Sequence, residues 1–236
     1  MKISLIIPMY NESPVIANTA RTLSEYMQEN FDDYEIVFSD DGSKDGSRAI
    51  VESLSLPYVR TVGYEQNRGK GSAVRHGVLS AEGELIMFTD ADLAYGTDVI
   101  RAYYDHYAEK RPDVIIGSRN LGRDGYEGYT LIRKLASKAY IRVLCIIGGF
   151  KLSDSQCGCK AFCRTAARDI FGRCTVDGFA FDFEAILWAG RLGYKIDELP
   201  VKIINHRESK VNVLRDSMKM LRDLLRIKKN VKSSKI

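Results

Sequence analysis

The chain has 236 residues, of which 45% are apolar and 28% charged, so it can bury a substantial core as one domain. Its formal net charge of +4 is too small to indicate a nucleic-acid partner, and no nucleic acid is expected. The first residues turn polar too early for a secretion signal, and no run approaches the ~20 apolar residues of a membrane span. We therefore expect a cytoplasmic protein.

Strands and helices are predicted to alternate through the first half. Apolar, β-branched or aromatic runs predict strands at residues 2–8, 34–39, 58–62, 84–89 and 113–117. Helical patterns lie between them, at about residues 13–29, 45–55, 69–80 and 97–109. Repeated strand–helix units predict an α/β fold, in which helices flank a Rossmann-like, mostly parallel sheet.

Each predicted strand of this half leads into a polar segment. Ligands of such sheets bind beyond the carboxyl ends of the strands, so a site is expected there. The segments are PMYNE, SDDGSKDGS, EQNRGKGS, TDADLA and GSRN, in chain order. A purely structural sheet does not require polar residues at all of these ends.

Asp90 and Asp92 lie one residue apart directly after the fourth strand. In an extended chain alternate side chains point to the same side, so the two carboxylates would repel each other unless a cation lay between them. Oxygen ligands suit Mg²⁺ or Mn²⁺, and Mg²⁺ commonly combines one or two carboxylates with substrate phosphates. The alternative is a polar turn that caps the helix expected at Thr97.

Two other segments favour a nucleotide. A carboxylate at a strand end, as at Asp40 or Asp41, can accept the imino N–H of uracil or guanine. NRGKGS fails the spacing of a phosphate-binding P-loop, but Lys70, between glycines at a helix start, can still contact an anion.

The cysteines do not indicate a metal or disulfide framework. Their number is odd, at five, which favours reduced thiols. Cys157, Cys159 and Cys163 cluster, but no second pair of thiols or histidines follows at the spacing of a structural zinc site.

Taken in order, PMYNE, SDDGSKDGS, NRGKGSAVRHG and TDADLA resemble the family 2 glycosyltransferases, which have the glycosyltransferase A-type fold. The later segments GSRN, SDSQCGCKAF, GFAFDFE and LPVKIINHRESKV resemble the branch that glycosylates a polyprenyl phosphate, the dolichyl-phosphate β-glucosyltransferases more than the mannose synthases. The resemblance implies inverting transfer of a hexose, glucose first, from a nucleotide-sugar donor such as UDP-glucose to a polyprenyl-phosphate acceptor. Three alternatives stay open: GDP-mannose as the donor, a saccharide or protein hydroxyl as the acceptor, and a protein that binds nucleotide sugars or recruits a partner without catalysing transfer.

The resemblance also implies the residues of a donor site. Asp90 and Asp92 would hold Mg²⁺ or Mn²⁺, which stabilises charge on the leaving diphosphate. The mannose synthases have Gln where this chain has Ala94, so a third ligand of those relatives is absent. The nucleotide would lie among Pro8, Tyr10, Glu12, Asp40, Asp41, Lys70 and Asp90.

A lipid phosphate is already an anion at neutral pH, because its second pKa is about 6, so its attack needs no strong base. Arg119 and Asp92 are the expected catalytic residues in that case, and Asp182 is the expected base if the acceptor is a hydroxyl. Lys160 would be either a phosphate contact or a solvated side chain. The implied acceptor and phosphate contacts are Arg119, Arg133, Ser137, Lys160, Arg207, Ser209 and Lys210.

Two later helices are expected to be amphipathic. Residues 129–147 carry apolar positions that belong either to the core or to a membrane surface: Leu131, Ile132, Leu135, Ala139, Val143 and Ile146. Residues 215–227 form a basic amphipathic helix, which either lies on an anionic membrane surface or docks on the core. Its apolar set is Leu214, Met218, Leu221 and Leu225.

These patterns divide the chain into a catalytic domain at residues 1–210 and a C-terminal helix and tail at residues 211–236. Within the domain, residues 1–120 would bind the nucleotide sugar and residues 121–210 the acceptor. Without a spanning segment, the enzyme would be peripheral at the inner face of the membrane, or would use a membrane-protein partner or a homo-oligomer.

Overall fold

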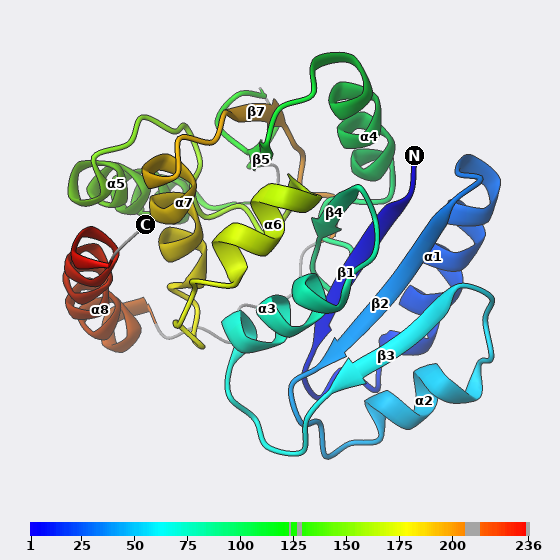
Figure 1. The fold of residues 1–236 in the computed structure, drawn as a ribbon. Helices are drawn as coiled ribbons and strands as arrows, with labels where there is room; N and C mark the ends of the chain where they lie inside the picture. Colours follow the sequence, from blue (N-terminus) through cyan, green and yellow to red (C-terminus); the bar gives the residue numbers. More distant parts are fainter. Residues whose placement is uncertain (123, 127–128, 206–212, 235–236) are drawn as a thin grey trace.

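The computed structural model describes residues 1–122, 124–126, 129–205 and 213–234. Within these ranges one sheet has the strand order β3-β2-β1-β4-β6-β5-β7 (Figure 1). The strands are β1 (Ile3–Met9), β2 (Tyr34–Asp40), β3 (Val59–Gly63), β4 (Leu85–Phe88), β5 (Val114–Ser118), β6 (Lys160–Cys163) and β7 (Ile196–Pro200). The helices are α1 (Ile16–Asn30), α2 (Ser47–Ser53), α3 (Lys70–Ser80), α4 (Asp98–Lys110), α5 (Leu131–Gly148), α6 (Arg164–Phe171), α7 (Phe181–Arg191) and α8 (Val213–Ser233).

The α/β fold and the mostly parallel sheet predicted from the sequence are confirmed. β1 pairs in parallel with β2 and β4, β2 with β3, and β5 with β7. β6 is antiparallel to both of its neighbours, β4 and β5. The strands and helices expected in the first half are all present, with ends that differ by a few residues.

Two hydrophobic cores cover the two faces of the sheet. On β1, Leu5 and Ile7 pack into the core that includes α1 and α4, whereas Ile6 packs into the core that includes α3, α6 and α7. Successive side chains of a strand point to opposite faces, so a strand covered on both sides is expected to be apolar at most positions. This explains the largely apolar runs of the first half, in which the buried Ser4 and Glu35 are hydrogen-bonded to each other.

The helix predicted at residues 129–147 is confirmed as α5, but its predicted apolar set is not core. Leu131 and Ile132 are 78% and 82% exposed, while Ile141 and Leu144 on the other side of α5 are buried. The helix predicted at residues 215–227 extends further, as α8. Its Leu224, Ile227 and Val231 are buried in the core, and α8 contacts α5 and α7.

Leu225, from the apolar set predicted for α8, is 59% exposed. The side chains of Leu214, Met218 and Leu221 lie outside the described residues. None of the helices in the described ranges is both long enough and apolar enough to cross a membrane.

Candidate active site

The carboxyl ends of the central strands and the start of β6 lie together along one side of the sheet, which we call its carboxyl edge. Strand register places Met9 beside Asp40, and Phe88 beside Lys160. Because β6 runs antiparallel to β4, its first residue, and not its last, reaches this edge. The segment after β4, which contains Asp90, therefore lies beside residues that the sequence separates widely.

Asp90 forms an ion pair with Lys70, the first residue of α3. The Lys70 Nζ donates to the Asp90 Oδ1 at 2.5 Å, and both side chains are partly exposed. Burial lowers the pKa of Lys70, but the attraction of Asp90, with smaller contributions from Asp182 and Asp92, outweighs it, so the pKa is raised. Lys70 is therefore a cation held at the end of β4, where an anionic diphosphate would be attracted.

The second oxygen of Asp90 lies against the backbone of Gly158. A Cβ at Gly158 would collide with the Asp90 Oδ2, so only glycine lets this segment pass so close to the carboxylate. The Gly158 N–H donates to the Tyr95 hydroxyl at 3.0 Å, which fixes the segment. Asp92 is partly exposed, and its Oδ1 accepts from the Ala94 N–H at 3.1 Å.

The donor set at this edge fits a divalent ion that shares its coordination with a substrate. The described residues contain no group of three or more His, Cys, Asp or Glu side chains that would hold a metal by themselves. Two carboxylates can instead hold Mg²⁺ or Mn²⁺ when substrate phosphates and water supply the remaining oxygens. Asp90 and Asp92 meet that requirement, whereas a closed structural metal site is not formed by the described chain.

Asp41 has a different environment from the one predicted for a base-contacting carboxylate. Its two oxygens accept hydrogen bonds at 2.7–2.9 Å from the Tyr64 hydroxyl, the Asn67 side chain and the Arg68 and Gly69 backbone N–H groups. A carboxylate has about four acceptor positions, so those of Asp41 are used within the protein. Asp41 organises the loop that leads into α3.

Asp40 is the better placed of the two for a contact with a base. Its Oδ1 accepts from the Ser43 hydroxyl at 2.5 Å, while its Oδ2 is 3.4 Å from the Ser43 nitrogen. The Asp40 carboxylate is at the end of β2, next to the end of β1. Asp40, and not Asp41, therefore has a carboxylate oxygen that can still accept a hydrogen bond at the carboxyl edge.

An Asp41→Asn variant is expected to lose about 2–3 kcal/mol of unfolding free energy, because an amide N–H₂ would face backbone donors that the carboxylate now satisfies. Urea denaturation measures this loss. Asp40→Asn is the matched comparison, and it should weaken UDP binding while costing less stability. A stable Asp41→Asn protein with weak UDP binding would show instead that Asp41 contacts the nucleotide.

The loops after β1 and β2 are joined into one rim. The Asn11 and Glu12 backbone N–H groups donate to the Ser43 and Ser47 hydroxyls, each at 2.9 Å. Tyr10, also in this rim, is 42% exposed. An exposed ring on this rim offers a surface on which a nucleotide base can stack.

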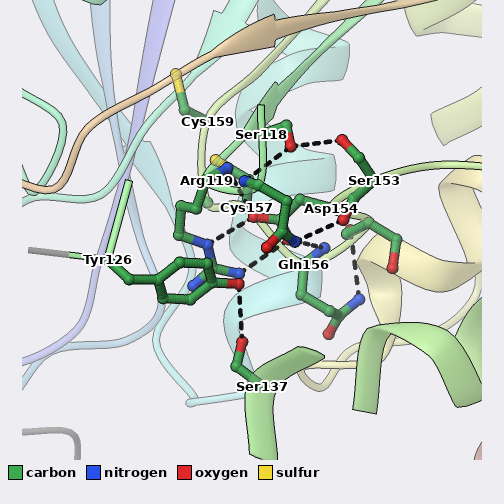
Figure 2. A network of polar contacts seen from close by, with 12 residues as sticks. Ser118, Arg119, Tyr126, Ser137, Ser153, Asp154, Gln156, Cys157 and Cys159 are labelled. Carbon is green, nitrogen blue, oxygen red and sulfur yellow. Dashed lines mark hydrogen bonds and ion pairs between the residues drawn. The ribbon is translucent and has the colours of Figure 1, made fainter. Parts of the chain in front are cut away.

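Arg119, which follows β5, is held by a buried carboxylate (Figure 2). Its Nε and Nη2 donate to the two oxygens of Asp154 at 2.6 and 2.9 Å, and Asp154 is fully buried. The guanidinium carbon lies 5.4 Å from the centre of the Tyr126 ring. The Tyr126 hydroxyl is hydrogen-bonded to Ser137 of α5 at 3.3 Å. The structure thus links Arg119 to Ser137 through Tyr126.

Glu198 of β7 stabilises this network by accepting hydrogen bonds from Ser153, the residue before Asp154. The Ser153 N–H donates at 2.8 Å and the Ser153 hydroxyl at 2.7 Å. The sequence did not identify Tyr126, Asp154 or Glu198 as site residues. The motif SDSQ, which contains Asp154, was the one signal that pointed to this segment.

Lys160 is neither a solvated side chain nor a group at the surface. It is fully buried, and its Nζ donates to the Cys157 carbonyl at 2.6 Å and to the Asp182 carboxylate at 2.7 Å. Asp182 lies in the first turn of α7 and is itself buried, which raises its pKa, while Lys160 opposes that rise. The prediction of a solvated Lys160 side chain was wrong, because its counter-ion lies on α7, 22 residues later in the chain.

The remaining predicted acceptor residues are incompletely described. Arg207, Ser209 and Lys210 lie outside the described residues, as does the side chain of Arg133.

The buried thiols next to this site are expected to be unreactive. Burial raises the pKa of Cys157 to about 11 and also raises the pKa of Cys159. At pH 8 about 0.1% of a thiol with that pKa is thiolate, against about a quarter for an ordinary cysteine. Iodoacetamide at pH 8 should therefore leave both unlabelled in the native protein and label them in urea, as mass spectrometry can show. Rapid native labelling would contradict the buried positions.

Comparison with known proteins identifies the fold and the family. The family model for "Glycosyl transferase family 2" matches residues 4–171. Crystal structures of glucosyl-3-phosphoglycerate synthase from Mycobacterium tuberculosis share the fold. The one with Mn²⁺, UDP and phosphoglyceric acid has a TM-score of 0.73 and 17% identity, and covers 100% of this chain and 80% of that one. Another, with Mg²⁺ and UDP, has a TM-score of 0.68 and 18% identity, and covers 95% and 79% of the two chains.

The sequence is more similar to two curated enzymes. A "Dolichyl-phosphate beta-glucosyltransferase" of Dictyostelium discoideum is 30% identical over 96% of this chain and 73% of its own length. The enzyme of the same name from Saccharomyces cerevisiae is 31% identical over 96% and 74%. The predicted resemblance and the glycosyltransferase A-type fold are confirmed, and the chain belongs to glycosyl transferase family 2.

Proposed function

We propose that this glycosyltransferase transfers glucose, with inversion, from UDP-glucose to a polyprenyl phosphate of the dolichyl type. The observation that carries the proposal is the 30–31% identity to dolichyl-phosphate beta-glucosyltransferases over 96% of the chain. That similarity spans both the segment with Asp90 and the segment with Arg119, so it includes the candidate donor and acceptor residues.

The donor would lie along the edge formed by β1, β2 and β4. Tyr10 offers a stacking surface for the base, and Asp40 offers an acceptor for the imino N–H. Asp90 and Asp92 would hold Mg²⁺ or Mn²⁺, which when bound supplies Lewis-acid stabilisation of the leaving diphosphate. Lys70 adds a cation beside Asp90 and is suited to hydrogen-bond a diphosphate oxygen.

The acceptor phosphate would approach from the side of β5 and α5. Arg119 is held in one orientation by Asp154 and Tyr126, so little side-chain freedom would be lost when it meets an anion. Its Nε and Nη2 serve Asp154, and the rest of the guanidinium is the part that would face the phosphate. Ser137 adds a hydroxyl from α5.

The surroundings of Asp182 favour a phosphate over a hydroxyl acceptor. A hydroxyl acceptor needs a general base within reach of its proton. Asp182, the predicted base, is engaged by the buried Lys160 ammonium at 2.7 Å. A phosphate monoester arrives already ionised, and its attack needs no such group.

The direct test incubates purified protein with radiolabelled UDP-glucose, Mn²⁺ or Mg²⁺, and polyprenyl phosphate, and measures label that enters the organic phase. Parallel arms replace the donor with GDP-mannose or the acceptor with a polyprenol, which lacks the phosphate. Labelled lipid that requires both UDP-glucose and the phosphate is the expected result. Label in a saccharide without lipid, or from GDP-mannose alone, would overturn the proposal.

The proposed acceptor also bears on location and organisation. An enzyme whose acceptor is a membrane lipid has to work at the membrane surface, and we place this one at its cytoplasmic side as a peripheral protein. We propose that residues 1–210 form the catalytic unit and that residues 1–120 supply most of the contacts to the donor. The described part of α8 packs on α5 and α7.

A further inference from the structure

The solvent-facing side of α5 is mainly apolar. Its exposed apolar side chains, which we call the α5 stripe, are 39–82% exposed and comprise Leu131, Ile132, Leu135, Val143 and Ile146. At 3.6 residues per turn these positions share one side of the helix. The side that faces the protein contributes Ile141 and Leu144 to the core. A helix that packs on a core normally presents mainly polar residues to solvent, whereas the exposed side of α5 is mainly apolar and includes only two exposed cations among its described side chains, Lys138 and Arg142.

We propose that the α5 stripe is the surface by which the enzyme lies on an anionic lipid bilayer, with its apolar side chains among the headgroups and upper acyl chains. A contiguous exposed apolar surface of this kind marks an interaction site. An interfacial helix requires apolar residues on one side and cations near them.

The charges around the stripe match an anionic surface. Residues 131–148 contain four cations and no acidic residue. Of these cations, Lys138 and Arg142 are exposed. Lys and Arg residues close to a bilayer are attracted by an anionic leaflet.

The neighbouring helix α8 contributes further positive charge. It lies beside α5 at the same end of the molecule (Figure 1). Its Lys229 and Lys232 are exposed, and with Lys228 they line a shallow hollow around the exposed Leu225. The same end of the fold therefore combines exposed apolar side chains with a concentration of cations.

The cations also argue against a second copy as the partner. In a two-fold contact through the stripe, Lys138 and Arg142 of both copies would be brought into one interface. Residues 131–148 have no acidic side chain to compensate the repulsion. Anionic lipids supply the missing countercharge.

This surface is joined to the candidate acceptor site. Ser137 lies on α5, and its hydrogen bond to Tyr126 leads to Arg119. Docking of the stripe would bring that network to the level at which a lipid phosphate sits. This last step rests on the proposed function, whereas binding of the stripe to a bilayer does not.

Co-sedimentation with vesicles tests the proposal. One set contains equimolar phosphatidylglycerol and phosphatidylcholine, and the other contains phosphatidylcholine alone. The protein should bind the anionic vesicles and lose much of this binding in high salt. A triple variant with Ile132→Gln, Leu135→Gln and Ile146→Gln should bind at least about tenfold more weakly. Gln is a good helix former, so α5 should stay intact.

Control variants separate this proposal from its rivals. Leu79→Gln, an exposed apolar position on α3, should bind vesicles like the parent. Equal vesicle binding by parent and triple variant would overturn the proposal. A parent dimer that the triple variant dissociates, without a change in vesicle binding, would overturn it in favour of a second copy.

A glucosyl-transfer assay keeps the two proposals distinguishable. With a short-chain, water-soluble polyprenyl phosphate the triple variant should turn over like the parent, but with long-chain acceptor in anionic vesicles it should be at least about tenfold slower. Vesicle binding without transfer to any lipid phosphate would defeat the proposed function alone. Equal loss with both acceptors would show that the substitutions damage the active site, and would overturn the docking role.

Discussion

An Asp92→Asn variant is expected to lose at least about 1,000-fold in kcat/KM for glucosyl transfer, which corresponds to about 4 kcal/mol of transition-state stabilisation. The charge on the departing diphosphate grows as the glycosidic bond breaks, and a neutral amide at Asp92 would hold a divalent ion much less firmly. Asp92 is partly exposed at the end of β4, so its replacement should cost little stability. The transfer assay with radiolabelled donor measures the loss.

A second measurement assigns that loss to metal binding. Electron paramagnetic resonance should show weaker Mn²⁺ binding by Asp92→Asn in the presence of UDP. Asp98→Asn is the matched control, because Asp98 is an exposed carboxylate in the first turn of α4. It should leave both transfer and Mn²⁺ binding unchanged. If Asp92→Asn keeps activity within about threefold of the parent, Asp92 is not part of the metal site.

A Lys160→Met variant is expected to be less stable than the parent by about 3–5 kcal/mol, because it leaves the buried Asp182 carboxylate without its counter-ion. For a chain of this length the melting temperature should fall by roughly 6–20 °C. Differential scanning calorimetry or urea denaturation measures the change. The pair joins β6 to α7, so its loss loosens the contact between the sheet and the helix that covers it.

A double variant tests whether the cost comes from the unpaired charge. Lys160→Met with Asp182→Leu removes both ions and should recover most of the stability. Lys195→Met is the surface control: Lys195 is 61% exposed and 3.6 Å from Asp197, and it should change stability by less than about 1 kcal/mol. If Lys160→Met is as stable as this control, the buried pair does not stabilise the fold.

The first half of the fold could be predicted because both faces of its sheet are covered. β1, β2 and β4 are buried at every position, so their sequences are mainly apolar, and two polar exceptions, Ser4 and Glu35, are hydrogen-bonded to each other. β6 and β7 could not be predicted in the same way. β6 begins with a lysine, and β7 lies at the edge of the sheet, where Asp197 and Glu198 are tolerated.

The candidate site was predictable as a set of segments but not as a set of contacts. Asp90 and Asp92 could be identified as candidate metal ligands because their spacing, one residue apart directly after a buried strand, is visible in the sequence. The pairing of Lys160 with Asp182 depends on how β6 and α7 pack, which no local pattern specifies. The contacts of Asp41 could not be predicted for the same reason, since the backbone donors that occupy it come from residues beyond β3.

α5 shows a related limit of sequence patterns. Helical spacing located the helix and collected Leu131, Leu135 and Ile146 on one side. Periodicity identifies such a side without saying whether protein, solvent or lipid covers it. The structure shows that the protein does not cover this side, because Ile141 and Leu144, on the other side of α5, are the residues that are buried.

The position of the antiparallel strand β6 determines the order in which the strands can pair during translation. β5 follows β4 in the chain, yet β6 lies between them in the sheet, and β5 pairs only with β6 and β7 within the described residues. A nascent chain that has emerged only as far as Ser118 can pair the strands β1, β2, β3 and β4 with one another. Its strand β5 stays unpaired until residues Lys160 to Cys163, which form β6, have been translated. Slowing translation after β5 should therefore prolong the exposure of an apolar strand to chaperones.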